Sequence, residues 1–386
     1  MQPTMYPKWI VFQLVEACNL RCPMCYEWGE RGSYLGQRPA RLPFEIARQV
    51  IQDCSPGKPF FELFGGEPFL HSRISDLIKL IGETGCALGI PTNGTLLTRF
   101  TDILVGDAPI RLWISLDGPE KINDLQRGSG VFRRALEGIE GLHSARIARG
   151  CAFPQIGMTY VVTPLNCEHV ERFFLESIEL SKLDFVEIVL QNFATEDECD
   201  DYETIVKRDF GGISATHARG YIRDVDHFSG MDLHRLSAQI HRVRSECRKR
   251  KVLFLSIPMT FEPDNLEHYV NARWHAMSDR RSRCAFPWMY AEVSARGDVT
   301  TCHSFYDITV GNVRDSRILD IWHGARMGKL RDHLRTNLLP ICTACCRYYN
   351  NPMSSVFNGI ETTKVAVSFP VRTGERKAGA AGSGET

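Results

Sequence analysis

The sequence lacks an apolar run that could cross a membrane, since none approaches the roughly 18 residues that such a helix needs. Residues 1–8 also lack the charged-then-apolar layout of a signal peptide. Neither charge is in excess, because 46 Lys and Arg balance 46 Asp and Glu. These absences predict a cytoplasmic protein that has neither a membrane nor a nucleic acid as its obligatory partner.

Cysteine is plentiful instead, with 14 residues in a chain that shows no export signal. Disulfide scaffolds are typical of small secreted proteins, whereas clustered cysteines in a reducing compartment are better explained as metal ligands. Seven cysteines fall into spaced motifs, and we expect most of the others to be small buried hydrophobic side chains or unreactive thiols. The length of 386 residues, 43% of them hydrophobic, allows a large core and two or three domains.

The first cysteine motif is Cys18-x3-Cys22-x2-Cys25, which directly follows the apolar, strand-like run 9–15. Three thiolates on one loop can hold three irons of a cubane iron–sulfur cluster, whose closed form requires four cysteines. The remaining iron is then open to a substrate or cofactor. The alternatives are a zinc knuckle or a chance cluster of buried thiols. Zinc normally takes a fourth nearby ligand, and the next Cys or His after Cys25 is Cys54, 29 residues further along the chain.

Strands and helices alternate through the first two thirds of the chain. The pattern of apolar residues predicts a parallel sheet with crossover helices, either an open doubly wound sheet or a barrel. In barrels the chemistry gathers on the loops that follow the strands. The predicted strands cover 9–15, 60–64, 86–90, 110–116, 156–162, 185–190 and 252–257. One predicted helix begins at Pro43, and the others cover 74–81, 132–143, 169–180 and 233–250.

Two segments break this alternation. Residues 194–202 are acidic and the sequence after them is irregular up to Gly230, which indicates either a lid or a solvated insertion. The composition changes over 262–283, which ends in the basic cluster Arg273, Arg280, Arg281 and Arg283. The predicted domains are 1–262, with an insertion around 192–230, and 263–350, followed by a tail, 351–386, whose Gly-, Ala- and Ser-rich end we expect to be disordered.

Polar motifs follow three of the predicted strands. The paired glycines of Gly65-Gly66-Glu67-Pro68 would let the backbone come close to a ligand, although a simple turn would look the same. Ser115 and Asp117 offer a hydroxyl and a carboxylate of the kind that hold ribose, and a helix cap or turn would use the same residues. The third motif is Thr92-Asn93-Gly94.

Together these motifs resemble the radical S-adenosylmethionine (SAM) superfamily. The resemblance implies that Cys18, Cys22 and Cys25 hold a 4Fe-4S cluster whose open iron is chelated by SAM. Met24 departs from the pattern, because many members have an aromatic residue there. The implied SAM-binding residues are Gly65, Gly66, Glu67 and Pro68 at the amino group, Ser115 and Asp117 at the ribose, Asn93 at the preceding strand end, and Tyr26 at the adenine.

A second set of cysteines, Cys284, Cys302, Cys342 and Cys345, lies near the C-terminus. Four thiolates would fully ligate one cluster or one structural zinc. The set, with Gly297 five residues before Cys302, resembles the SPASM/Twitch extensions of radical SAM enzymes such as sulfatase-maturing enzymes and 2-deoxy-scyllo-inosamine dehydrogenase. Full SPASM domains have further cysteines after the last pair, whereas only Cys346 follows here. The resemblance therefore implies one auxiliary 4Fe-4S cluster, with Cys346 as an alternative ligand.

The resemblance implies a partial (β/α)6 TIM-like barrel with the first cluster at its mouth, capped by the small C-terminal iron–sulfur domain. It implies an oxidoreductase-type enzyme in which an electron donor such as flavodoxin or ferredoxin drives cleavage of SAM to a 5′-deoxyadenosyl radical, which takes a hydrogen atom from the substrate. An auxiliary cluster favours the oxidative outcomes, dehydrogenation or cross-linking. Epimerisation, decarboxylation and rearrangement are the other outcomes.

The substrate class is open between two alternatives. Many peptide-modifying relatives carry an N-terminal leader-binding domain, whereas only 17 residues precede Cys18. We therefore expect a small molecule such as a sugar, cyclitol or amino-acid derivative. A peptide or protein substrate is the alternative, since sulfatase-maturing relatives act on protein without such a domain. A non-catalytic zinc or iron–sulfur binding protein is the alternative from another functional class.

His303 directly follows Cys302, at a position where sulfatase-maturing relatives have an Asp that acts as a base. A histidine could do this near neutral pH, or it could be structural. We expect His303→Ala to abolish substrate turnover while uncoupled SAM cleavage continues, because the SAM site keeps its residues. Mass spectrometry of product and of 5′-deoxyadenosine measures both rates, and unchanged turnover would contradict the proposed base.

Overall fold

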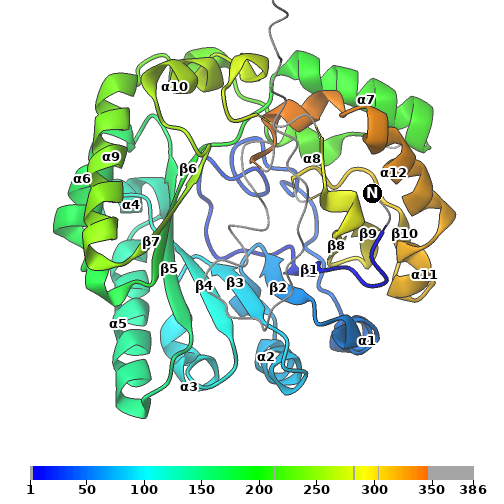
Figure 1. Cartoon of the computed structure of the whole chain (residues 1–386), viewed down its shortest axis with the longest axis horizontal. Coiled ribbons are helices and arrows are strands. Elements are labelled where there is room, and N and C mark those ends of the chain that lie inside the picture. Colours follow the sequence, from blue (N-terminus) through cyan, green and yellow to red (C-terminus); the bar gives the residue numbers. More distant parts are fainter. Residues whose placement is uncertain (1–2, 212–213, 281–282, 303, 347–386) are drawn as a thin grey trace, which may run out of the picture.

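The computed structural model describes residues 3–211, 214–280, 283–302 and 304–346. Ten strands form a single sheet in the order β10-β9-β8-β1-β2-β3-β4-β5-β6-β7. Figure 1 shows the sheet curving around loops on its inner side, with helices on its outer side. The predicted α/β class with a parallel, barrel-like core is confirmed.

Strands β1 to β7 form the parallel part of the sheet, each pairing with the next in the chain. All seven strands predicted from the sequence are present, with small differences at their ends. Their C-terminal ends therefore share one edge of the sheet. The strands are β1 (Trp9–Val15), β2 (Phe60–Gly65), β3 (Leu88–Thr92), β4 (Ile110–Ser115), β5 (Gln155–Val162), β6 (Phe185–Leu190) and β7 (Leu253–Ile257).

Side chains alternate between the two faces of these strands, which creates two separate cores. On β1, Ile10 and Phe12 belong to the large core that the outer helices cover, and Trp9 belongs to an aromatic cluster on the inner face. That cluster also contains Phe60, Trp113 and Phe185. The outer helices are α1 (Phe44–Cys54), α2 (Ile74–Glu83), α3 (Thr101–Leu104), α4 (Glu120–Arg127), α5 (Val131–Arg149), α6 (Val170–Arg172) and α9 (Leu233–Arg250).

The predicted helix over 169–180 is only partly correct. One short α-helical turn, α6, is followed by a π-helical turn over Phe173–Ser177 and a 3-10 turn over Leu180–Lys182. The adjacent rings of Phe173 and Phe174 are both fully buried, and both pack against Tyr160 at centroid distances of 5.3 and 5.7 Å. Consecutive residues of a regular α-helix point in different directions, so burying both rings on one partner favours the wider turn.

The sequence after residue 202, predicted to be irregular up to Gly230, is partly helical, and the predicted insertion around 192–230 stays a prediction. Residues Glu196–Phe210 form a regular helix, α7, and Thr216–Arg219 form a short helix, α8. A capping box begins α7, because the Thr195 hydroxyl accepts from the Glu198 amide and the Glu198 carboxylate accepts from the Thr195 amide. The T-x-x-E pattern of this capping box is present in the sequence. It is easily overlooked because the surrounding residues are mostly acidic.

The C-terminal part of the chain continues the same sheet. Strand β8 (Tyr290–Val293) pairs in parallel with β1, and β9 (Asp298–Thr300) and β10 (Gly311–Asn312) extend it in antiparallel fashion. The predicted boundary between 262 and 263 stays a prediction, and the predicted tail 351–386 lies outside the described residues. The helices of this part are α10 (Pro263–Val270), α11 (Ile318–Trp322) and α12 (Ala325–Thr336).

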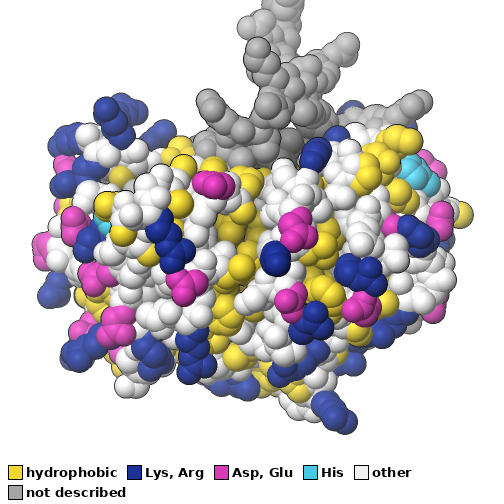
Figure 2. All heavy atoms as spheres, turned by 90° about the horizontal axis from the view of Figure 1, so that it is seen from below, with side chains coloured by type: hydrophobic (Ala, Val, Ile, Leu, Met, Phe, Trp, Pro, Cys, Tyr) yellow, Lys and Arg dark blue, Asp and Glu magenta, His cyan; other side chains and the backbone are white. Residues whose placement is uncertain are grey.

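The surface carries both charge signs in close mixture. Figure 2 shows Lys and Arg side chains interspersed with Asp and Glu over the face seen from below, with apolar side chains between them. Surface ion pairs such as Arg48 with Glu45 and Arg73 with Asp76 account for part of this mixture. Among the helices that the structure describes, none is long and apolar enough to cross a membrane.

The capping box makes α7 testable. Thr195→Ala removes the side chain that accepts from the Glu198 amide and should lower the free energy of unfolding by about 1 kcal/mol. Thr204→Ala is the matched control, since Thr204 is exposed within the same helix and caps nothing. Chemical denaturation of both variants measures the difference. Equal stability of the two variants would contradict the role of the capping box.

Candidate functional site

The first three cysteines lie on the loop that follows β1. Cys18, Cys22 and Cys25 form one small cluster with Leu20 and Val131. The turn is closed by the Cys25 amide, which donates to the Cys22 carbonyl at 3.0 Å. Two of the sulfur atoms also accept backbone hydrogen bonds, Cys18 from Leu20 and Cys25 from Trp28, each at 3.4 Å.

These thiols are held in an environment that disfavours their ionisation. Burial raises the pKa of Cys18 to about 11 and that of Cys25 to about 12. Burial also raises the pKa of Cys22, and the neighbouring Arg127 charge opposes that rise. Cysteine binds a metal as the thiolate, so binding of a cluster to these three cysteines would release protons. The metal, rather than the surrounding protein, would stabilise the thiolates.

The glycine pair after β2 packs directly on the chain that leads into Cys18. The amides of Gly66 and Glu67 donate to the carbonyls of Val15 and Ala17 at 2.8 and 3.0 Å. A Cβ on Gly66 would lie 2.4 Å from the Ala17 carbonyl oxygen, so no larger residue fits. The end of β1 therefore already uses these two amides, and the predicted contact of this turn with SAM stays a prediction.

Glu67 and Asn93 connect the ends of β2 and β3 to the cysteine loop. The buried Glu67 carboxylate accepts from the Thr92 hydroxyl at 2.9 Å and from the Asn93 amide at 2.8 Å. Burial raises the pKa of Glu67 to about 7. The Asn93 side chain donates to Asn19 at 2.8 Å and lies 3.9 Å from the Cys18 sulfur. The structure thus brings three predicted site residues, Cys18, Glu67 and Asn93, together.

Ser115 and Asp117 do not share one environment. Ser115 is half-buried at the end of β4, whereas the Asp117 carboxylate is fully buried. One Asp117 oxygen accepts from Arg127 Nε at 2.6 Å and from the Gln126 amide at 2.8 Å, and the other accepts from the Val161 amide at 2.7 Å. The predicted ribose contact stays a prediction for Ser115. For Asp117 the geometry points to an internal ion pair instead.

Tyr26, the predicted adenine-pocket residue, stacks on Tyr221 with ring centroids 4.4 Å apart and 15° between planes. Tyr221 follows α8 in the segment predicted to be an insertion. Arg223 from the same segment donates to the Met24 carbonyl at 3.3 Å. Tyr221 and Arg223 therefore cover part of the cysteine loop, as one of the two interpretations of this segment, a lid, would require, although no sequence motif marks these contacts.

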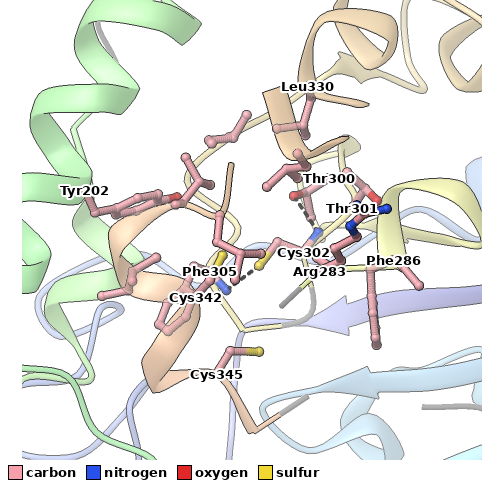
Figure 3. A pocket seen from close by; sticks show the side chains of 17 residues that line it. Tyr202, Arg283, Phe286, Thr300, Thr301, Cys302, Phe305, Leu330, Cys342 and Cys345 are labelled. Atoms are coloured by element: carbon pink, nitrogen blue, oxygen red, sulfur yellow. Dashed lines mark hydrogen bonds between the residues drawn. The ribbon is translucent and has the colours of Figure 1, made fainter. Parts of the chain in front are cut away.

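The four cysteines near the C-terminus that were predicted to share one metal site line one cavity. Figure 3 shows Cys302, Cys342 and Cys345 from the end of β9 and the turn over 340–344, and Cys284 lines the same cavity. Burial raises the pKa of Cys302 to about 12, and the Phe305 amide donates to its sulfur at 3.2 Å. The cavity is otherwise mostly apolar, with Tyr202, Phe286, Leu330, Leu334, Leu339 and Ile341 among its lining residues.

Both cysteine sets have the donor chemistry that iron–sulfur clusters require. None of the 14 cysteines, all of which are described, forms a disulfide bond. The buried Thr301 hydroxyl beside Cys302 has no hydrogen-bond partner among the described residues and could donate to a cluster in this cavity. No described group of three or more His, Cys, Asp or Glu residues is placed to hold a single metal ion. A cubane cluster does not need such convergence, because each thiolate binds a different iron.

Comparison with known proteins assigns both regions. Residues 12–175 match the model of the radical SAM superfamily, and residues 284–346 match the SPASM iron–sulfur cluster-binding domain. The chain is a member of the radical SAM superfamily with a C-terminal SPASM domain. This radical SAM protein is therefore an enzyme that uses SAM and a 4Fe-4S cluster, and its SPASM domain implies auxiliary iron–sulfur binding.

Its relatives differ in what they act on. It is 27% identical to the AdoMet-dependent heme synthase of Methanosarcina barkeri over 84% of this chain and 85% of that protein. It is 28% identical to the mycofactocin maturase MftC of Mycolicibacterium smegmatis over 43% and 41%, so this match spans under half of either chain. The SAM-bound structure of Streptococcus suis SuiB shares the fold, with a TM-score of 0.59, 17% identity and coverage of 88% of this chain and 72% of that one.

Several residues at this site were not predicted from the sequence. Arg127 reaches Cys22, Tyr221 stacks on Tyr26, and the buried Glu27 accepts from the Tyr306 hydroxyl at 3.1 Å. The last contact joins the cysteine loop to the SPASM region. No local sequence pattern predicts these contacts, because the two partners of each contact lie far apart in the sequence or belong to different elements. The predicted base His303 lies outside the described residues.

The predicted ligand Cys345 and its alternative Cys346 differ in their position relative to the cavity. Cys345 lines the cavity, whereas Cys346 is buried and is not among the described lining residues. We expect Cys345→Ser to lose about half of the bound iron, the share of one of two clusters, and Cys346→Ser to keep it. Iron and sulfide analysis after anaerobic purification measures both variants. Equal iron loss in the two variants would show that Cys346 also serves as a ligand.

Proposed function

We propose that this radical SAM enzyme oxidises a small molecule. Cys18, Cys22 and Cys25 hold the SAM-binding cluster, and the four cysteines of the C-terminal cavity hold one auxiliary cluster. The observation that carries the proposal is the difference between a set of three thiols on one loop and a set of four around an apolar cavity. Three thiols leave one iron for SAM, whereas four complete a cluster that suits electron transfer.

When bound, SAM and the reduced first cluster supply a radical that takes a hydrogen atom from the substrate. The chain excludes water from the barrel interior with the aromatic cluster of Trp9, Phe60, Trp113 and Phe185, which closes the inner face of the sheet. Glu67 and Asn93 fix the strand ends beside Cys18, where the amino group of SAM is proposed to bind. Tyr26, stacked on Tyr221, and Ser115 complete the proposed SAM contacts.

The second cysteine set supports oxidation over the redox-neutral outcomes. Dehydrogenation removes a hydrogen atom, then a proton and an electron, and the electron needs an acceptor. The four thiols around one mostly apolar cavity offer the ligands for such an acceptor. Electrons for the first cluster would come from a small redox protein of the flavodoxin or ferredoxin class.

The small-molecule substrate has support from one relative. A protein that matches over most of both chains is named as a heme synthase, whose product is a small molecule. Peptide modification is the second candidate, because another relative is named as a maturase. The match to the maturase covers 43% of this chain, against 84% for the heme synthase, and this difference favours the small-molecule substrate.

Anaerobic reconstitution followed by iron analysis and a SAM-cleavage assay tests the enzyme class. We expect about eight irons per chain and formation of 5′-deoxyadenosine under reducing conditions. Cys25→Ser should lose about half of the iron and all SAM cleavage. Cys151→Ser is the matched control, since Cys151 is half-buried and belongs to neither set. Zinc in place of iron, without SAM cleavage, would contradict the proposal.

Mass spectrometry distinguishes the substrate classes. The enzyme is incubated separately with small metabolites, including porphyrins, sugars and amino acids, and with peptides encoded beside its gene. A small molecule that loses two hydrogens supports the proposal. Loss of carbon dioxide instead, or a modified peptide, would contradict it in favour of decarboxylation or maturation.

A further inference from the structure

The end of α4 places a positive charge against the cysteine loop. Arg127 is the last residue of α4, and its side chain is 8% exposed. Its Nε donates to the fully buried Asp117 carboxylate at 2.6 Å. Gln126 and the Val161 amide donate to the same carboxylate, so the anchor of the guanidinium is itself fixed from two further sides.

Arg127 also lies against the first cysteine set. Its carbonyl oxygen accepts from the Cys22 thiol at 4.0 Å, and the positive charge of its side chain opposes the rise in the Cys22 pKa that burial causes. Val131, at the start of the following helix α5, packs against Cys22 as well. Asp124 ties the turn between α4 and α5 by accepting from the amides of Gly130 and Phe132. The position of the charge is therefore set by the fold rather than by a flexible side chain.

Carboxylates of the opposite sign also act on this loop, and Arg223, which donates to the Met24 carbonyl, is a second cation near Cys25. The carboxylates of Glu67 and Glu27 act on Cys18, and Glu27 acts on Cys25. A cluster held there gains one negative charge when it is reduced. Buried carboxylates oppose that gain, whereas a buried cation close to a ligand sulfur favours it.

We propose that the buried Asp117 and Arg127 pair positions a cation on Cys22 and thereby raises the reduction potential of the cluster held by Cys18, Cys22 and Cys25. Arg127 is the group that acts on the sulfur, and Asp117 orients it. The inference rests on the proposed function, because it requires a cluster on this loop. It also assigns Asp117 a task that differs from contact with the ribose of SAM.

A redox titration of the first cluster, followed by electron paramagnetic resonance without added SAM, tests the proposal. Cys342→Ser is introduced into every protein so that only the first cluster contributes to the signal. Arg127→Gln should lower the equilibrium constant for reduction at least tenfold, which is about 59 mV for a one-electron couple. Asp117→Asn should change it in the opposite direction, because it removes a negative charge while the amide oxygen of Asn can still accept from Arg127 Nε and hold the cation in place. Arg127→Lys should lie nearest to the parent protein.

The opposite signs separate electrostatics from damage to the fold, which would move both variants the same way. Arg146→Gln is the matched control, since Arg146 pairs with Asp184 at 2.5 Å at the other end of the barrel. Its potential should equal that of the parent. If Arg127→Gln fails to fold, Asp117→Asn and Arg127→Lys still decide the result.

Two failures are distinguishable. A parent protein without a cluster signal would overturn both the proposed function and this inference. A parent protein with a normal signal, but with equal potentials in Arg127→Gln and Arg127→Lys or with same-direction shifts in Arg127→Gln and Asp117→Asn, would overturn the inference alone.

Discussion

The whole site depends on a backbone contact between the ends of two neighbouring parallel strands. Gly66 and Glu67, after β2, donate their amides to the carbonyls of Val15 and Ala17, just before Cys18. This close approach is possible because Gly66 has no Cβ, since a Cβ there would collide with the Ala17 carbonyl. The contact fixes where the cysteine loop leaves the sheet. Every other residue at the mouth of the barrel is then positioned relative to that loop.

The buried polar groups around the loop form hydrogen bonds with one another. Glu67 joins two strand ends, Asp117 holds Arg127, and Glu27 accepts from Tyr306. In a low-dielectric interior such contacts are strong, and an unpaired member would be costly. The same low dielectric raises the pKa values of the thiols and makes a single buried cation effective on a cluster. Rigidity and redox tuning therefore have a common physical origin.

The two iron–sulfur regions belong to one continuous structure. Strand β8 pairs with β1, so the SPASM region begins as an extension of the barrel sheet. Tyr202 of helix α7 lines the cavity that contains the four C-terminal cysteines. Tyr221, which follows α8, stacks on Tyr26 of the cysteine loop. The segment between β6 and α9 thus contacts both cysteine sets. A change there could affect both sites through packing alone.

The sequence by itself determined the strands of the barrel and the two cysteine sets. Strand periodicity, glycine turns and ligand spacing are local properties, and local properties are readable from neighbouring residues. It did not determine the break at Phe173, the contact of Tyr221 with Tyr26, or the partner of Asp117. Each of these depends on which side chain arrives from a distant segment to fill a buried space or satisfy a buried charge. Tertiary structure alone decided them, because the free energy of burial depends on the neighbours that the complete fold supplies.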